Sequence, residues 1–139
     1  MTVAYDKSPK HGSTATTHGY SVRVTPRFLK SESAPGENKY TFRYDVTIRN
    51  EGGQPAQLVA RRWIISDANG DSDVVEGEGV VGLQPMFVPG QAFEYQSYCP
   101  LTTPWGTMEG AFVMQDNSGE RFEIAIARFY LVCPEPTSG

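Results

Sequence analysis

The sequence predicts an all-β protein, a sandwich of about seven antiparallel strands of the immunoglobulin or fibronectin type III kind. Three observations predict this fold class. Apolar and polar residues alternate with a period of two, turn residues separate the alternating stretches, and no stretch has helical periodicity. The 139 residues, 39% hydrophobic and 20% charged, suffice for one globular core. We therefore expect a single domain.

The first two strands show the clearest alternation. Residues 20–28 and 40–49 place their apolar side chains at even positions, which predicts strands with one buried face. Pro26 favours an edge position for the first strand, because proline cannot donate a ladder hydrogen bond. A loop over 31–38 and a turn over 50–55 separate these strands from their neighbours.

The third strand, residues 58–66, is apolar on both parities at Trp63, Ile64 and Ile65. This pattern predicts a central strand, with Trp63 as an anchor of the core. Asn69-Gly70 is a hairpin signal. A short return strand over 73–75 follows, and then a crossing over 77–90 that is rich in glycine and proline.

The last three strands are predicted at 91–98, around 108–114 and at 122–131, with a loop at 99–106 and a turn at 116–119. In the final strand the apolar positions change parity from Ile126 to Phe129. A β-bulge near Ala127-Arg128 would produce this change.

The termini have too little apolar content to order themselves, so we expect a flexible tail at 1–19, the domain at 20–134 and a second tail at 135–139. The opening residues lack the apolar core of a signal peptide, which predicts a cytoplasmic protein. Cys99 and Cys133 are then expected to be free thiols, since disulfides are rare in a reducing compartment.

Charge and histidine content exclude several function classes. Twelve basic and sixteen acidic residues give a net charge of −4, so we expect neither nucleic-acid nor membrane binding. Both histidines, His11 and His18, fall in the predicted tail, which leaves the folded body without an ordinary neutral-pH general base. We therefore expect no enzymatic activity, no catalytic residue and no cofactor.

The glycines at Gly77, Gly79 and Gly82 satisfy the pattern G-x-G-x-x-G. The dinucleotide fingerprint requires a helix to begin in this loop, and the prolines that follow forbid one. We interpret the glycines mainly as a flat crossing between the sheets. An anion-binding nest of backbone amides is the alternative.

Acidic residues around the Asn69-Gly70 hairpin copy the ligand spacing of a calcium-binding loop, without its glycine or its flanking helices. We interpret them as a solvated acidic hairpin and expect no strong metal site. The weak candidate ligands are Asp67, Asp71, Asp73 and Glu78.

Two features are candidates for binding a partner. Four arginines occupy the outward parity of the first two strands and would share a face if those strands pair: Arg23, Arg27, Arg43 and Arg49. Trp105 lies in a proline-rich loop, where it either serves as a docking residue or folds back over the core. The competing interpretation of the arginines is a solvated sheet face.

Several stretches resemble the ApaG family: RWIISDANG (62–70), VEGEGVVGLQP (75–85) and GTMEG (106–110), with Pro89, Gly90, Phe93, Tyr95 and Ser97 between them. The resemblance covers residues 20–134. It implies a bacterial protein with a fibronectin-type sandwich and a role in binding proteins. It also implies an association with cobalt resistance and magnesium efflux, and it marks Gly77, Gly79 and Gly82 as the suspected pyrophosphate contact.

Our interpretation is a non-enzymatic interaction domain whose partner is another protein. The alternative is a binder of nucleotide or pyrophosphate that acts through the loop at 77–82. A divalent-metal sensor that uses the acidic hairpin is a third class.

Overall fold

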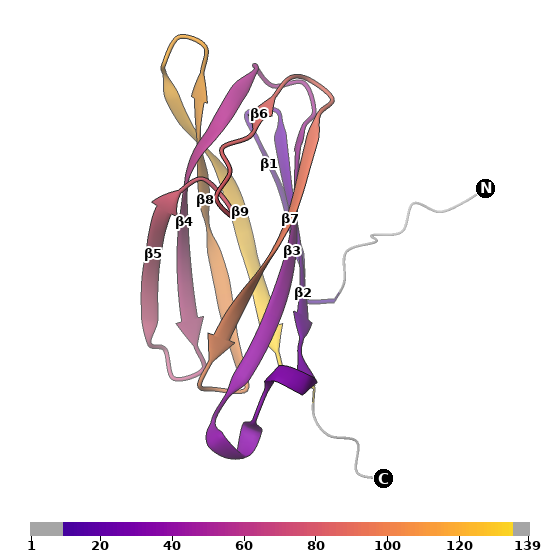
Figure 1. Ribbon diagram of the computed structural model, residues 1–139, viewed down its shortest axis with the longest axis vertical. Coiled ribbons are helices and arrows are strands. Elements are labelled where there is room, and N and C mark those ends of the chain that lie inside the picture. Colours follow the sequence, from indigo (N-terminus) through magenta and orange to yellow (C-terminus); the bar gives the residue numbers. More distant parts are fainter. Residues whose placement is uncertain (1–9, 135–139) are drawn as a thin grey trace, which may run out of the picture.

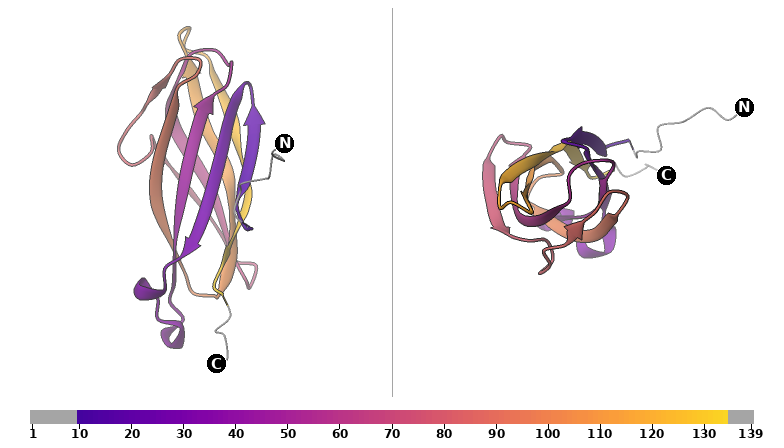
Figure 2. Two further views of the ribbon diagram at one scale, coloured as in Figure 1. Left: turned by 90° about the vertical axis from the view of Figure 1, so that its right-hand side faces the viewer. Right: turned by 90° about the horizontal axis from the view of Figure 1, so that it is seen from above.

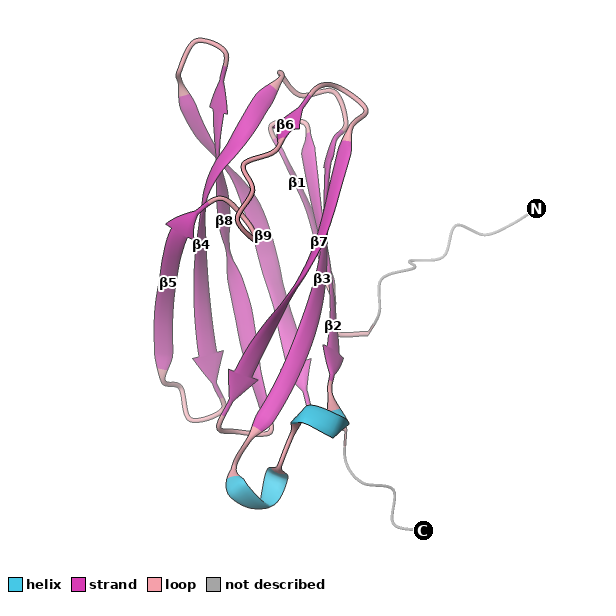
Figure 3. Cartoon of the chain, in the orientation of Figure 1, coloured by secondary structure: helices cyan, strands magenta, loops and turns pink. Residues whose placement is uncertain are grey.

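The computed structural model describes residues 10–134 and confirms an all-β sandwich (Figures 1 and 3). The described residues form nine strands and two short 3-10 turns. The strands are β1 (Ser13–Thr17), β2 (Tyr20–Phe28), β3 (Tyr40–Asn50), β4 (Ala56–Asp67), β5 (Ser72–Glu78), β6 (Met86–Phe87), β7 (Ala92–Leu101), β8 (Trp105–Asp116) and β9 (Arg121–Val132). The turns, Lys30–Glu32 and Pro35–Glu37, lie in the predicted loop at 31–38. In this described part of the chain, no helix is both long and apolar enough to cross a membrane.

The strands form two antiparallel sheets, in the orders β1-β2-β3-β7 and β5-β4-β8-β9, and β6 pairs with β4 (Figure 2). The sandwich is closed on one side, where β1 lies against β9. There Ser13 Oγ donates to the Ala127 carbonyl at 2.7 Å, and the Tyr130 amide donates to the His11 carbonyl at 2.9 Å. On the opposite side the outermost strands are β7 and β5, and the sandwich stays open between them.

The register follows the alternation of the sequence. Strands β2 and β3 pair so that every even residue faces inward, as Val24↔Val46 and Phe28↔Phe42 illustrate. Between β8 and β9 the pairs Met108↔Phe129 and Gly110↔Ile126 leave two residues of β9 opposite one of β8. The bulge predicted near Ala127-Arg128 is therefore confirmed, and it lets both ends of β9 bury their apolar side chains.

Trp63 is the centre of the core, as the sequence predicts. It is 3% exposed and its ring contacts those of Tyr44, Phe112 and Phe129, with centroids 5.3, 6.1 and 5.9 Å away. These contacts join strands of both sheets. Edge-to-face packing of this kind adds to the free energy gained by burying the large apolar rings.

The predicted N-terminal tail is wrong at residues 13–17, which form β1. This strand has no large apolar side chain. It is held by pairing with β2 and by hydrogen bonds to β9, including one from the Ala125 amide to Thr17 Oγ1 at 3.1 Å. Residues 1–9 and 135–139 of the predicted tails lie outside the described residues.

Three further predictions need correction. The loop predicted at 99–106 spans only residues 102–104, because β7 continues to Leu101 and β8 begins at Trp105. The return strand predicted at 73–75 extends over Ser72–Glu78. Strand β2 is not an edge strand, because it lies between β1 and β3. On the β1 side, however, pairing ends at Val24, so no strand pairs with Pro26 there.

We expect Trp63→Ala to lower the free energy of unfolding by about 3–5 kcal/mol, because it removes a buried aromatic side chain that joins the two sheets. Urea unfolding followed by circular dichroism measures this loss. Trp105→Ala is the matched control, since Trp105 is 45% exposed, and we expect a change within about 0.5 kcal/mol. Equal losses in the two variants would contradict the placement of the core.

Candidate functional site

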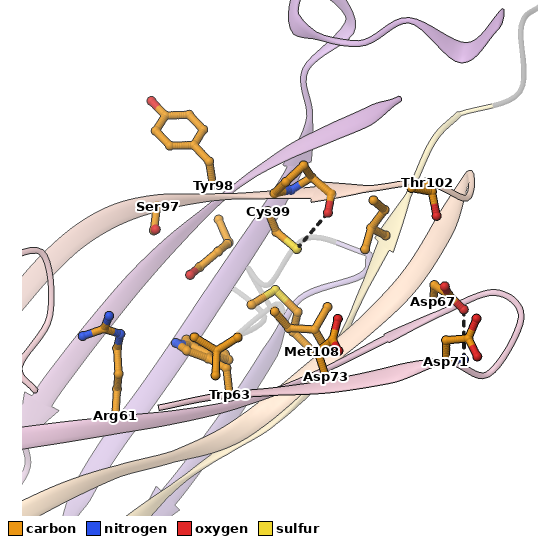
Figure 4. Close-up of a pocket in the computed structure, with 15 residues that line it drawn as sticks. Arg61, Trp63, Asp67, Asp71, Asp73, Ser97, Tyr98, Cys99, Thr102 and Met108 are labelled. Carbon is orange, nitrogen blue, oxygen red and sulfur yellow. Dashed lines mark hydrogen bonds between the residues drawn. The ribbon is translucent and has the colours of Figure 1, made fainter. Parts of the chain in front are cut away.

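Within the described residues 10–134, a cleft lies on the open side of the sandwich. It has a volume of about 420 Å³, within the range of roughly 300–1,000 Å³ typical of ligand sites. Strands β4 and β5 form one wall and β7 forms the other (Figure 4). In Figure 4, Arg61 and Ser97 lie at one end of this cleft and Asp67 and Asp71 at the other.

The strand period explains why these residue types meet in the cleft. Alternate residues of β4 point between the sheets, so Arg61 and Asp67 share a face with the buried Trp63. The partners of Arg61 and Trp63 on β5 are Gly77 and Val75. Because β5 is the outermost strand of its sheet, its inner face borders the cleft instead of the core.

The middle of the cleft is apolar and holds a buried thiol. Trp63, Met108 and Cys99 line it, and Cys99 is 3% exposed. Burial raises the pKa of the Cys99 thiol from 9.0 to about 11, because the thiolate would lose its hydration. At neutral pH this cysteine is therefore a protonated, weakly reactive group. Cys99 and Cys133 are both free.

The basic end of the cleft is organised by Arg61. Its Nη1 donates to the carbonyl oxygens of Glu78 and Gly79, each at 2.9 Å, and so holds the end of β5 and the start of the crossing. A Cβ at Gly77 would lie 2.8 Å from Arg61 Nη2, so a larger residue there would displace the guanidinium. Nearby, burial raises the pKa of the Tyr44 hydroxyl, a shift that a hydrogen bond with Ser97 partly offsets.

The acidic end is built by the β4–β5 hairpin. Asp67 Oδ1 accepts hydrogen bonds from the amides of Asn69 and Asp71 at 2.8 and 3.1 Å, which confirms the predicted hairpin. Asp67, Asp71 and Asp73 line the cleft, whereas Glu78, the fourth weak metal candidate, lies near Arg62 at the other end of β5. Within the described ranges no three His, Cys, Asp or Glu side chains gather as a metal site would require.

The glycine loop directs its backbone groups toward the protein. The amides of Gly79, Val80 and Leu83 donate to carbonyl oxygens at 2.8–2.9 Å. Gly79 has a φ of +62°, and a Cβ there would lie 2.3 Å from the Leu83 carbonyl oxygen. These three amides are thus already paired, so they form no preorganised nest for an anion. Of the three motif glycines, Gly82, with a φ of +80°, has open space around it.

The four arginines of the predicted stripe do share one face, because β2 pairs with β3. Arg27 stands directly opposite Arg43, and Arg23 and Arg49 are opposite Thr47 and Ser21. Arg43 forms an ion pair with Asp45, Nε to Oδ1, at 3.2 Å. This face lies on the outside of the sandwich, away from the cleft.

Trp105 begins β8 beside Val132, and its exposed side chain does not cap the core. The docking role of Trp105 stays a prediction. Its carbonyl accepts a hydrogen bond from Thr103 Oγ1 at 2.7 Å, which fixes the backbone of the short loop before it.

The expectation that the folded body lacks imidazole is wrong. His18 forms the β1–β2 turn and packs against Phe122, with ring centroids 5.4 Å apart. It lines a shallow hollow together with Gly53 and Asp116 at the closed side of the sandwich. No local pattern predicts this placement, because β1 has no apolar stripe and depends on hydrogen bonds to the distant strand β9.

Comparisons with known proteins find sequences and structures similar to this chain. A family model described as the ApaG domain matches residues 30–116. Protein ApaG from Methylobacterium sp. (strain 4-46) is 51% identical over 120 residues, covering 86% of this chain and 92% of the relative. Protein ApaG from Anaeromyxobacter sp. (strain K) is 50% identical over 122 residues, or 88% of this chain and 96% of that protein.

Solved structures share the fold. The crystal structure of an ApaA protein from Bordetella pertussis superposes with a TM-score of 0.80 at 45% identity, and covers 84% of this chain and 95% of that one. The C-terminal domain of wzt superposes with a TM-score of 0.53 at 8% identity, over 94% of this chain and 82% of that one, and shows the likeness of fold alone.

We expect the two thiols to react with Ellman's reagent at different rates. At pH 8, Ellman's reagent should modify the partly exposed Cys133 quickly and the buried, protonated Cys99 only after unfolding. The native Cys99 thiol keeps its proton up to about pH 11, whereas an unfolded thiol loses it near 9.0, so this group lowers the free energy of unfolding between those values. Two fast thiols in the native protein, or one in Cys133→Ser, would contradict the burial of Cys99.

We expect Arg61→Met to loosen the start of the crossing, since the two bonds from the guanidinium to the carbonyls of Glu78 and Gly79 are lost. The amide of Gly79, which donates to the Val59 carbonyl, should exchange at least about tenfold faster by NMR. The matched control is Arg62→Met, because Arg62 pairs with Glu123 on the outer face. Equal exchange in both variants would show that Arg61 does not hold this segment.

Proposed function

This chain belongs to the ApaG domain family, and we propose that it acts as a non-enzymatic protein-interaction domain. The observation that carries this proposal is the concentration of exposed large apolar side chains in one segment. Of the nine such residues in the described part of the chain, six fall between residues 74 and 88: Val74, Val75, Val81, Leu83, Met86 and Val88. Single exposed apolar residues are common, but a concentration of them is typical of a protein-binding surface.

The segment lies on the open side of the sandwich, so its exposure follows from the fold. Strand β5 is outermost in its sheet, and between residues 79 and 86 the crossing that follows it buries only Gly79 and Val80. Arg61 fixes the start of this crossing through the carbonyls of Glu78 and Gly79. A partner would therefore meet a largely preformed surface, which lowers the entropic cost of binding.

The groups around the cleft support binding over catalysis. Burial raises the pKa values of Tyr44, Tyr95 and Cys99, so all three stay protonated at neutral pH and none is poised as a base or nucleophile. The nucleotide alternative has less support, since three amides of the glycine loop already donate within the protein. We place the domain in the bacterial cytoplasm. We propose that it contributes to cobalt resistance and magnesium efflux through the protein that it binds.

The test is capture from bacterial lysate with the immobilised chain, identified by quantitative mass spectrometry. We expect Leu83→Lys and Val75→Lys each to reduce capture of the specific partner at least tenfold, because lysine cannot be buried unpaired in an apolar interface. Tyr130→Lys is the matched control, since it places the same charge at an exposed position of β9, across the same sheet. Arg27→Glu tests the arginine face in the same way.

If the two variants of this segment captured the partner as well as Tyr130→Lys does, an interface on this segment would be contradicted. ATP, diadenosine tetraphosphate and pyrophosphate, titrated with NMR detection, should leave the amides of Gly79 and Gly82 unshifted. Saturable shifts there would favour the nucleotide-binding alternative over the interaction domain.

A further inference from the structure

We propose that the cleft binds an extended segment of a partner protein, which adds to the free edge of β7 as an antiparallel strand. The inner side chains of that segment would be basic, apolar and acidic at positions i, i+2 and i+4. This inference rests on the proposed interaction function and specifies its docking site and the chemistry of its partner.

The first argument is the free edge of β7. Among residues 10–134, β7 pairs with β3 alone. Backbone groups alternate in direction along a strand, and Gln91 directs its carbonyl to the Asn50 amide of β3 at 2.9 Å. Gln96 and Tyr98 therefore direct their amides and carbonyls away from β3. Pro100, which has no N–H, faces the same way and marks where strand addition would end.

The second argument is the uncovered inner face of β5. Its inner positions are Asp73, Val75 and Gly77, which pair with Ile65, Trp63 and Arg61 of β4. Val75 is 42% exposed although its partner Trp63 is buried. A strand added beside β7 would lie over this face and bury Val75. Strand addition supplies affinity through main-chain hydrogen bonds and specificity through alternate side chains.

The third argument is the order of charges along the cleft. Both β4 and β7 run from the Arg61 end to the acidic end (Figure 4). An antiparallel strand would enter at the acidic end, so its first inner side chain would meet Asp67 and Asp73, its second Val75 and its third Arg61. Asp73 pairs with Ile65, which lies four residues after Arg61 on β4. At about 3.3 Å per residue, this span is about 13 Å, the same as the distance between positions i and i+4 of the bound strand.

The charges also show that the occupant is not a second copy of this chain. The two strands that border the open side, β5 and β7, contain no Lys or Arg. A second β5 that turned Asp73, Val75 and Gly77 inward would bring Asp73 against the acidic end of the cleft, and neither face of β5 offers a basic side chain there. Like charges in such contact oppose association. The complementary strand must come from a different protein.

The probe is a capped peptide of sequence TKTVTET, and its control is TETVTKT, which has the same composition with the two charges exchanged. We expect TKTVTET to bind and to shift the amides of Gln96, Tyr98 and Val75 in NMR spectra, and TETVTKT to bind at least tenfold more weakly. Equal binding of the two peptides, or shifts elsewhere on the domain, would overturn the proposal.

Charge reversal on β5 tests the register. Asp73→Lys should weaken TKTVTET at least tenfold, and the peptide TETVTET should recover the lost affinity. Glu76→Lys is the matched control, because Glu76 lies on the outer face of the same strand and should leave binding unchanged. Both positions are exposed, so neither change threatens the fold.

The two proposals fail separately in these experiments. If no peptide binds but partner capture still depends on Leu83, the interaction function holds and strand addition is wrong. If capture is also insensitive to Leu83 and Val75, both proposals are wrong.

Discussion

The rest of the structure depends on the packing of Trp63 between the two sheets. Its ring contacts Tyr44 of β3, Phe112 of β8 and Phe129 of β9, so one side chain fixes β4 relative to both sheets. Arg61 and Asp67, two and four residues away on the same face, are then placed at opposite ends of the cleft. The bulge in β9 serves the same contact, since it returns Phe129 to the inner face after the parity change.

The asymmetry of the sandwich decides where a site can form. On the closed side, β1 covers β9 through hydrogen bonds that include Ser13 Oγ to the Ala127 carbonyl. On the open side no strand among residues 10–134 covers the inner face of β5, and a cleft remains. A sandwich with its interior filled has few other ways to offer a concave surface, because close packing leaves no voids inside. Uneven coverage of the two sheets therefore provides the site without weakening the core.

Local patterns in the sequence predict most of the fold. Alternation with a period of two identifies β2, β3 and the core role of Trp63, and the parity change near Ala127 identifies the bulge. Strand β1 escapes prediction because its sequence, STATT, has no apolar stripe, and besides pairing with β2 it depends on hydrogen bonds to residues about 110 positions away. The cleft escapes prediction for the same reason, since it needs the registers of three strands. Arg61 could have been singled out from the sequence, because it is a charged residue on the same strand parity as Trp63.

The glycine motif shows how a pattern that resembles a ligand site can have a structural cause. Gly77 leaves room for the Arg61 guanidinium, and Gly79 takes a positive φ where the chain passes close to the Leu83 carbonyl. Two of the three glycines therefore shape the backbone that Arg61 holds at the end of β5. Because Arg61 bonds to the carbonyls of Glu78 and Gly79, the motif and the basic end of the cleft form one unit. A requirement for those two glycines would then reflect the shape of a protein-binding surface rather than contact with a phosphate.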